Sequence, residues 1–308
     1  MCKVVPKGSA PHHGAELPKN GEYKRSRVGT CAHRVYALLV SVTSVASDIF
    51  ARITSEREGQ FSWMPDRLRR SINYIHTTVV DLFSLAMLLL FFPINLERVD
   101  PKTYDPSGGP PIFLVHGFLG SSNNFLYLRR RLEKAGFTNV FTINLGHPFQ
   151  SIDQYADRVN KKRKEIQTIV GEEGMVFIGH SMGGLLAEEC GRKKAKEIIT
   201  IGTPLEGTKM AQIASSLSEA AEEMKCDSAR LKKLQSKVQE DPKTRYFHIA
   251  TQVDHIVRPA TSAEGPDNHK HTTLDATGHI GYLFSKRVAD LIIEELDSLR
   301  PADHTPPV

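Results

Sequence analysis

The chain has 308 residues, of which 40% are hydrophobic and 24% are charged, and its formal net charge is +5. These values exclude a disordered tail protein, a collagen and a multi-span membrane channel, and the length allows one large hydrophobic core with at most a smaller appendage. Residues 1–34 contain seven Lys or Arg and two Glu, so they account for the positive excess, and the balanced remainder gives no indication of a nucleic-acid partner.

The N-terminal part divides into a tail and a helical pattern. Residues 1–33 are rich in Pro, Gly, Lys and His without a hydrophobic period, which predicts a flexible basic tail. Apolar residues then recur at three- and four-residue steps over residues 34–53, which predicts an amphipathic helix. This pattern consists of Val35, Leu38, Leu39, Val42, Val45, Ile49 and Ile53. An alternative is a cleaved signal peptide with a short apolar core at residues 37–46, in which case the protein would be secreted.

A second apolar stretch covers residues 79–96 and follows Arg67, Arg69 and Arg70. Its length lies between that of a buried or interfacial helix and the roughly 20 residues that cross a bilayer. We expect residues 34–96 to form a helical segment that anchors the protein at a membrane, either spanning it or lying in its plane. The alternative is a helix packed on the body of the protein. If the stretch spans, the basic residues favour a cytoplasmic N-terminal side.

The rest of the chain has the pattern of an α/β domain. Residues 97–110 combine charge, Pro and Gly-Gly, which predicts a linker. Short apolar runs then alternate with helical patterns, which predicts a doubly wound, mostly parallel sheet over residues 111–300, preceded by the N-terminal helices and followed by a tail at 301–308. The predicted strands are residues 112–115, 140–145, 175–179, 198–202 and 246–250, and the predicted helices are 124–135, 152–170 and 182–192.

A charged helical segment at residues 208–243 interrupts this alternation of strands and helices. It is either a cap over the active site or an ordinary pair of solvated helices.

The strand at 175–179 leads into Gly179-His180-Ser181-Met182-Gly183-Gly184, and a helical pattern follows. Gly-x-Ser-x-Gly between a strand and a helix is typical of a nucleophilic serine on a tight turn. Such a strained turn needs neighbours without side chains, here Gly179 and Gly183, and it presents the Ser181 hydroxyl at a helix N-terminus. The helix end supplies N–H groups to a developing oxyanion, so we expect Ser181 as nucleophile, Met182 as an amide donor and His180 as support for the turn.

A second amide donor is expected after an earlier strand. Residues 111–115 end in His116-Gly117-Phe118, where Gly117 would let the loop pass close to the nucleophile. The Phe118 N–H would then point at the substrate oxygen beside the N–H of Met182. The alternative is a plain turn. We expect His116 beside this loop, and His147, which follows another strand, in the lining of the substrate pocket.

A serine hydroxyl needs a base to take its proton and an acid to hold the tautomer of that base. In this class of fold the chain order is Ser, acid, His, which favours Asp254 after the strand at 246–250 and His279 before the last helical pattern. Competing acids are Asp267 and Asp275, and competing imidazoles are His255, His269 and His271. The last two are expected in a polar, solvent-exposed loop.

No metal or cofactor is expected. Four cysteines are present, and their spacing suggests neither a zinc site nor a disulfide framework; they are Cys2, Cys31, Cys190 and Cys226. The thirteen histidines include no His-Glu-x-x-His pair, and the sequence has neither a P-loop nor Gly-x-Gly-x-x-Gly.

Together these motifs resemble those of bacterial serine lipases and esterases of the α/β-hydrolase fold, over residues 111–299. The segments that carry the resemblance are residues 114–120, 143–146, 179–184, 201–204, 207–208, 254 and 278–279. The resemblance implies that fold, a triad of Ser181, Asp254 and His279, and amide donors at Phe118 and Met182. Two departures are Leu205, where such proteins often carry a histidine, and residues 1–96, which match none of the family's motifs.

We therefore expect a membrane-associated serine hydrolase that cleaves carboxylic esters of lipids or other acyl groups, without an obligatory protein partner. An acyltransferase, a thioesterase or an amidase would use the same catalytic groups. Outside the enzymes, the alternative is a catalytically silent interaction module that has kept the fold.

Overall fold

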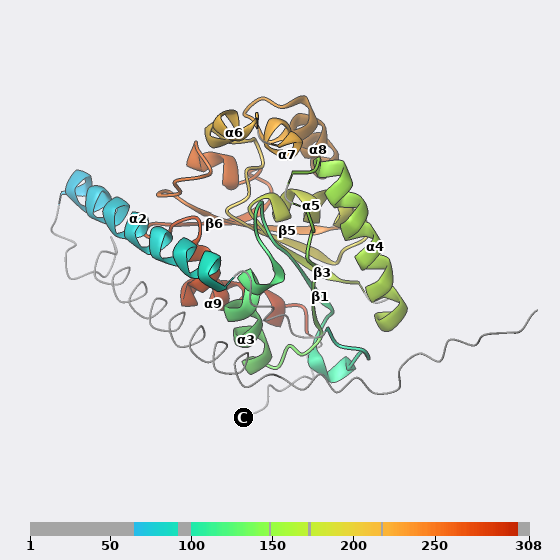
Figure 1. Ribbon diagram of the computed structural model, residues 1–308. Helices are drawn as coiled ribbons and strands as arrows, with labels where there is room; N and C mark the ends of the chain where they lie inside the picture. Colours follow the sequence, from blue (N-terminus) through green and yellow to red (C-terminus); the bar gives the residue numbers. More distant parts are fainter. Residues whose placement is uncertain (1–64, 92–99, 148, 172–173, 217, 301–308) are drawn as a thin grey trace, which may run out of the picture.

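The core of the protein is a parallel β-sheet. The computed structural model describes residues 65–91, 100–147, 149–171, 174–216 and 218–300 (Figure 1). Six strands lie in the order β2-β1-β3-β4-β5-β6, and each of these pairings is parallel. Their bounds are β1 Ile112–Val115, β2 Val140–Thr142, β3 Val176–His180, β4 Glu197–Ile201, β5 Arg245–Thr251 and β6 Lys270–Leu274. The predicted α/β class with a doubly wound sheet is confirmed.

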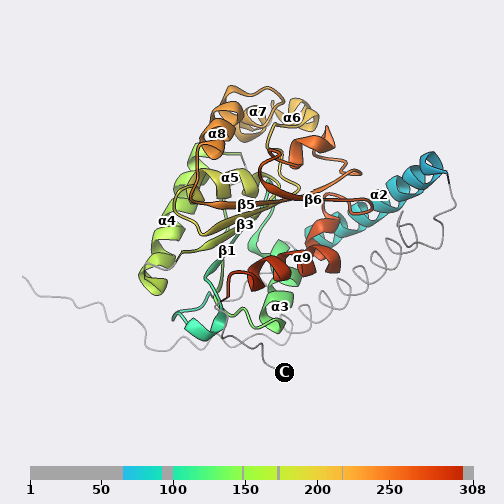
Figure 2. The ribbon, with the colours of Figure 1, turned by 180° about the vertical axis from the view of Figure 1, so that it is seen from behind.

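Helices cover both faces of this sheet, which explains why its central strands are continuously apolar. Successive side chains of β1 point to opposite faces and enter two separate cores. Phe113 and Val115 belong to the core under α4 (Ile152–Val170) and α5 (Met182–Gly191). Ile112 and Leu114 belong to the core under α3 (Leu126–Lys134) and α9 (Lys286–Asp297). Figures 1 and 2 show the two helical layers on opposite sides of the sheet.

The predicted insert at residues 208–243 contains three short helices. They are α6 (Lys209–Ala214), α7 (Glu219–Glu223) and α8 (Ala229–Gln239), and they lie together at one end of the molecule (Figure 1). Shorter 3-10 turns are η1 (Pro106–Gly108), η2 (Ser122–Phe125), η3 (Ala260–Ala263) and η4 (Gly281–Phe284). The insert begins against the loop after β5, because the Thr208 hydroxyl accepts a hydrogen bond from the N–H of Arg258 at 3.1 Å.

The segment predicted as a linker packs against the domain where the structure describes it. Asp100 Oδ1 accepts a hydrogen bond from the N–H of Thr142 at 3.0 Å, and its Oδ2 lies 3.0 Å from Nζ of Lys162. Residues 100–110 are thus fixed to β2 and α4. The tails predicted at 1–33 and 301–308, and the amphipathic pattern at 34–53, lie outside the described residues.

The region of His269 and His271 differs from the expected polar loop. His271 lies in strand β6, and His269 is half-buried, with its Nδ1 3.0 Å from Nε2 of His248 and its ring stacked on Tyr246. The prediction of a solvent-exposed loop was therefore half right for each residue: His269 lies in a loop but is half-buried, and His271 is exposed but belongs to a strand. β6 is an edge strand with exposed residues at its start, so it lacks the apolar run by which the inner strands are recognised.

Helix α2 (Asp66–Phe91) includes residues 79–91 of the second apolar stretch and lies beside η4. It turns a polar face to the domain, on which Arg69, Asn73, Thr77 and Ser84 are buried. The exposed apolar side chains recur at steps of three and four on the other side of the helix; they include Leu68, Ile75, Val79, Leu82 and Phe83. No helix among the described residues is both long enough and apolar enough to cross a bilayer. Residues 92–96 lie outside the described part.

Candidate active site

Ser181 occupies the turn between β3 and α5 in a conformation that L-residues rarely adopt. Its φ is 56° and its ψ is −128°, and its N–H donates to the carbonyl oxygen of Ile201 at 2.9 Å. A Cβ added to Gly179 would lie 2.4 Å from the Gly183 oxygen, and one added to Gly183 would lie 2.1 Å from the Val115 oxygen. A side chain at either glycine would therefore clash with backbone atoms. The strained backbone conformation of Ser181 is of the kind found at functional sites.

The side chain of Ser181 lies at the N-terminus of α5. The residue is half-buried, and its hydroxyl makes no hydrogen bond to any other residue that the structure describes. It stands at the N-cap position of α5, where the first N–H groups of the helix have no partner within the helix and create a positive potential. A negative charge that develops next to Ser181 is stabilised by this arrangement.

The two predicted amide donors belong to the segment after Ser181 and to the loop after β1. Met182 is the first residue of α5 and is buried. The loop after β1 passes close to the serine, since a Cβ added to Gly117 would lie 2.8 Å from Cβ of Ser181. Phe118 follows in that loop and is half-buried against the core. In the described part of the chain, neither Met182 nor Phe118 uses its N–H in a loop or turn hydrogen bond.

His116 holds the loop after β1 to the segment that follows β2. Its Nε2 accepts the N–H of Leu145 at 3.0 Å, so its Nδ1 carries the proton and donates to the carbonyl oxygen of Gly117 at 2.9 Å. Burial lowers the pKa of His116 to about 4, and the ring stays neutral around pH 7. His116 is therefore a support for the Gly117–Phe118 loop.

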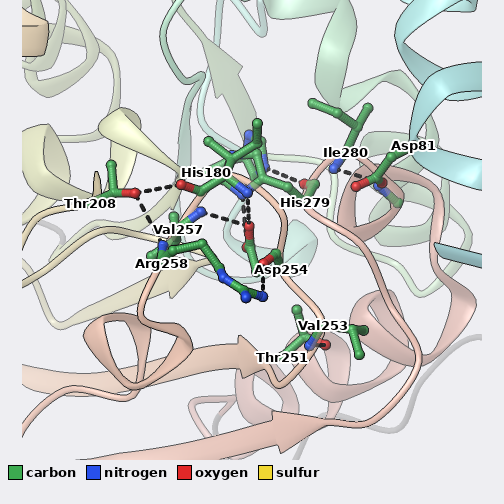
Figure 3. A network of polar contacts seen from close by, with 12 residues as sticks. Asp81, His180, Thr208, Thr251, Val253, Asp254, Val257, Arg258, His279 and Ile280 are labelled. Carbon is green, nitrogen blue, oxygen red and sulfur yellow. Dashed lines mark hydrogen bonds and ion pairs between the residues drawn. The ribbon is translucent and has the colours of Figure 1, made fainter. Parts of the chain in front are cut away.

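Asp254 and His279 form a buried pair (Figure 3). Nδ1 of His279 lies 2.8 Å from Oδ2 of Asp254. The other carboxylate oxygen, Oδ1, accepts the N–H groups of Ile256 and Val257, each at 2.7 Å. Because the carboxylate accepts at Nδ1, the neutral ring carries its proton there, and Nε2 keeps a lone pair that can accept a proton.

Charge and burial act against each other in this pair. Burial disfavours the ionised form of Asp254, but the charge of His279 and the hydrogen bonds from His279, Val257 and Ile256 outweigh it and lower the pKa of Asp254. Burial likewise disfavours the cationic form of His279, but the charge and hydrogen bond of Asp254, with the charge of Asp81, raise the pKa of His279. The site thus stabilises an imidazolium at His279.

His180 joins the serine turn to the histidine loop. Its Nε2–H donates to the carbonyl oxygen of His279 at 2.9 Å, and the centroids of the two rings lie 4.9 Å apart. Burial lowers the pKa of His180 to about 3, so this ring is neutral. Since His180 immediately precedes Ser181, the contact brings the loop of His279 next to the serine turn.

The remaining histidines considered in the sequence make other contacts. His147 is exposed, and its Nδ1 accepts the N–H of Phe149 at 3.3 Å; no contact with Asp254 or His279 is present among the described residues. His255 lies beside Asp254 in sequence but contacts α2, and His269 pairs with His248. Among these imidazoles, His279 is the one whose ring donates a hydrogen bond to the Asp254 carboxylate.

One residue that contacts the site, Asp81, was not predicted from the sequence. Oδ1 of Asp81, on α2, accepts the N–H groups of Ile280 at 3.0 Å and Gly281 at 2.8 Å (Figure 3). The only trace of this in the sequence is an acidic residue inside an otherwise apolar stretch. Ionisable residues in apolar segments are usually functional, but nothing in the pattern indicates a partner 199 residues away.

No group of three or more His, Cys, Asp or Glu side chains that would suit a metal ion occurs within the described ranges.

Solved structures with this fold include lipases. The mature form of lipase BlEst2 from Bacillus licheniformis superposes with a TM-score of 0.53 at 20% identity, over 64% of this chain and 96% of that one. Lipase B of Aspergillus fumigatus superposes with a TM-score of 0.55 at 18% identity, over 67% of this chain and 57% of that one. At such low identities the likeness describes the fold alone.

Sequence comparison gives two further matches. Residues 110–214 match the family model described as alpha/beta hydrolase fold. Lysosomal thioesterase PPT2-B of Xenopus laevis is 30% identical over 127 residues, which make up 39% of this chain and 43% of that protein. This chain thus spans less than half the length of that curated relative.

Proposed function

We propose that this chain, whose fold is that of the α/β hydrolases, is a serine hydrolase that cleaves carboxylic esters through an acyl-enzyme on Ser181. The observation that carries the proposal is the Asp254–His279 pair, whose 2.8 Å contact leaves Nε2 of His279 as the basic nitrogen. The strained turn at Ser181 and the hydrogen bond between His180 and His279 support it, since they bring serine and imidazole to the same edge of the sheet.

The first half-reaction forms the acyl-enzyme. Nε2 of His279 takes the hydroxyl proton as Oγ of Ser181 bonds to the carbonyl carbon, and the resulting oxyanion accepts the N–H groups of Phe118 and Met182. Asp254 stabilises the imidazolium that forms. The C–O bond to the alcohol then breaks, and the proton passes from His279 to the leaving oxygen.

The second half-reaction releases the acid. A water molecule loses a proton to Nε2 of His279 while its oxygen bonds to the acyl carbon. The same two N–H groups stabilise the second tetrahedral intermediate. When the bond to Ser181 breaks, Oγ recovers the proton from His279, and the free enzyme returns with one molecule of carboxylic acid formed.

Labelling with a fluorophosphonate probe tests the proposal, because this electrophile reacts with activated serines. Wild-type protein is expected to be labelled promptly, whereas the variants S181A and H279A are expected to stay unlabelled. Thermal unfolding of both variants at the wild-type temperature shows that they are folded. A wild type that stays unlabelled would contradict the proposal and support the silent module instead. A series of nitrophenyl esters of increasing acyl length would then define the acyl group that is preferred.

A thioester substrate is the second candidate, favoured by the 30% identity to the Xenopus thioesterase. The catalytic groups are the same for oxygen and sulfur esters, so the leaving group distinguishes them. An oxygen ester and a thioester with the same acyl chain should be compared by kcat/KM. A preference of at least tenfold for the thioester would replace the ester proposal.

We further propose that the exposed apolar face of α2 binds a lipid surface and lies in its plane. Leu68, Ile75, Val79 and Leu82 are each more than half exposed on this face, and exposed apolar helix faces of this kind are suited to the boundary between headgroups and acyl chains. The polar face is occupied by contacts to the domain. This placement would bring the active site to lipid-derived acyl esters.

A further inference from the structure

Helix α2 contacts the loop that carries the base. Oδ1 of Asp81 accepts two backbone N–H groups, those of Ile280 at 3.0 Å and Gly281 at 2.8 Å. These are the first two residues after His279. Figure 3 shows Asp81 reaching from α2 to this backbone beside the Asp254–His279 pair.

The loop backbone lies against the Asp81 carboxylate because Gly278 has no side chain. A Cβ added to Gly278 would lie 2.4 Å from both carboxylate oxygens of Asp81, and one added to Gly281 would lie 3.4 Å from Oδ1. Gly278 and Gly281 flank His279 and Ile280. The close approach of the carboxylate therefore depends on Gly278, whereas a side chain at Gly281 would only touch it.

The same helix contacts the loop of the acid. Oγ1 of Thr78 lies 3.0 Å and Oγ1 of Thr77 lies 3.3 Å from Nε2 of His255, which follows Asp254. Both hydroxyls donate to main-chain carbonyls of α2, so Nε2–H of His255 is the donor to them. The ring of Tyr74 packs edge-on against His255, with centroids 4.5 Å apart. One helix thus touches the residues next to both members of the pair.

We propose that α2 is a positioning element of the active site and that Asp81 is a positioning residue, which fixes the backbone after His279 and thereby aims the imidazole at Ser181. This inference rests on the proposed hydrolase function. A hydrogen-bonded acceptor on a rigid helix restricts the loop, and the efficiency of proton transfer depends on displacements of about 1 Å.

Two substitutions separate the hydrogen bonds from the charge. D81N keeps an Oδ1 that accepts both N–H groups, whereas D81A removes the acceptor. Asp66 is the matched control, because it is the other aspartate of α2, is exposed, and pairs with Arg69 away from the site. G278A is an independent test, because its added methyl group would clash with the Asp81 carboxylate and so separate it from the loop.

The readouts are kcat and KM on a soluble ester, the rate of fluorophosphonate labelling, and thermal unfolding as a check on folding. We expect kcat of D81A and G278A to fall about tenfold to a hundredfold with KM changed less than about twofold. D81N is expected to recover kcat to within about threefold of the wild type, and D66N to match the wild type. The D81A/G278A double variant should lose no more than the larger single loss, because both changes break one contact.

Different outcomes refute different statements. A wild type without labelling or turnover would refute the proposed hydrolase function. An active wild type whose D81A or G278A variant keeps full kcat would refute the positioning role alone. Equal losses in D81N and D81A would also refute it, because the hydrogen-bond acceptor would then be irrelevant. If D81A does not fold, G278A and D81N still decide between these outcomes.

Discussion

Oδ2 of Asp254 lies 2.8 Å from Nδ1 of His279, while Oδ1 of the same carboxylate is held by two backbone N–H groups. This arrangement leaves the carboxylate no freedom to turn. The loop of Ile256 and Val257 therefore holds the carboxylate against the imidazole, and acceptance of the Nδ1–H by the carboxylate sets the tautomer of the base.

The variant D254N should lose activity through the tautomer of His279. The asparagine oxygen is expected to accept the N–H groups of Ile256 and Val257, so its NH2 group faces Nδ1. The ring must then carry its proton on Nε2, where Ser181 needs a base. We expect kcat to fall roughly 10⁴-fold with little change in KM, as measured on a soluble ester. A loss below tenfold, in a variant with wild-type thermal stability, would contradict the role of Asp254.

The dependence of kcat/KM on pH should reflect His279. The groups that face its ring are Asp254, Asp81, His180 and Tyr282. Although burial opposes its protonation, Asp254 and Asp81 raise the pKa of His279 above 6.5. Since only the neutral ring accepts a proton, activity should rise with pH and reach half its plateau above pH 6.5.

The variant D81N provides a matched comparison for this profile. It removes one of the charges that raise the pKa of His279, so the midpoint of its acidic limb should move to lower pH. A midpoint below pH 6.5 in the wild type would show that the pKa of the base is not raised by its neighbours.

Glu188 should make the stability of the fold depend on pH. The residue is fully buried on α5, and burial raises its pKa to about 8 against a hydrogen bond from Gln235. A raised pKa means that the folded state binds the proton more tightly than the unfolded state does. The contribution of this proton to the free energy of unfolding is therefore complete below the unfolded-state pKa of 4.5 and is lost as pH rises through about 8.

The variant E188Q is therefore expected to flatten the pH dependence of unfolding. In wild-type protein the free energy of unfolding should fall by up to about 1.4 kcal/mol per pH unit from this group alone between these two values. Urea unfolding at several pH values between 5 and 8 measures the difference between the two proteins. Parallel curves for wild type and E188Q would contradict the prediction.

Charge on the apolar face of α2 should weaken lipid binding. Leu82 is 63% exposed, and burying such a side chain in an apolar phase is worth about 1.5–3 kcal/mol. L82E should therefore bind phospholipid vesicles at least about tenfold more weakly in a flotation assay and keep its kcat on a soluble ester. Ile213 on α6 is the control, since it is 73% exposed on another element, and I213E should float like the wild type. Equal losses in both variants would point to net charge rather than to α2.

Much of the domain could be predicted because its local signals agree with its packing. β1 and α4 have the predicted bounds: β1 is apolar on both faces, and Ser151 caps α4 with its hydroxyl while Gly171 ends the helix. The turn at Ser181 was recognised because steric contact leaves room for glycine alone at Gly179 and Gly183.

The position of α2 could not be predicted, because the sequence gives two faces of a helix and not the one that packs. The usual expectation buries the apolar face, whereas here Asn73, Thr77 and Asp81 contact the domain and the apolar face is left outside. The hydrogen bonds that hold α2 join side chains of the helix mostly to backbone groups in loops of the domain. Contacts of that kind leave no hydrophobic pattern by which they could be found.

Asp81 accepts the backbone N–H of residue 280 and does not contact its side chain for this bond. Every amino acid except proline offers the same donor, so the hydrogen bond does not depend on which of them stands at position 280. The contact with Asp81 therefore does not depend on the side chain of Ile280, which packs against the core under α3 and α9 instead. A truncated chain that begins at residue 100 would keep Ser181, Asp254 and His279. It would lack α2 and therefore the hydrogen bonds between Asp81 and the backbone after His279. On the proposed function, the shortened protein is expected to turn over an ester more slowly than the full chain, because its imidazole loses this support.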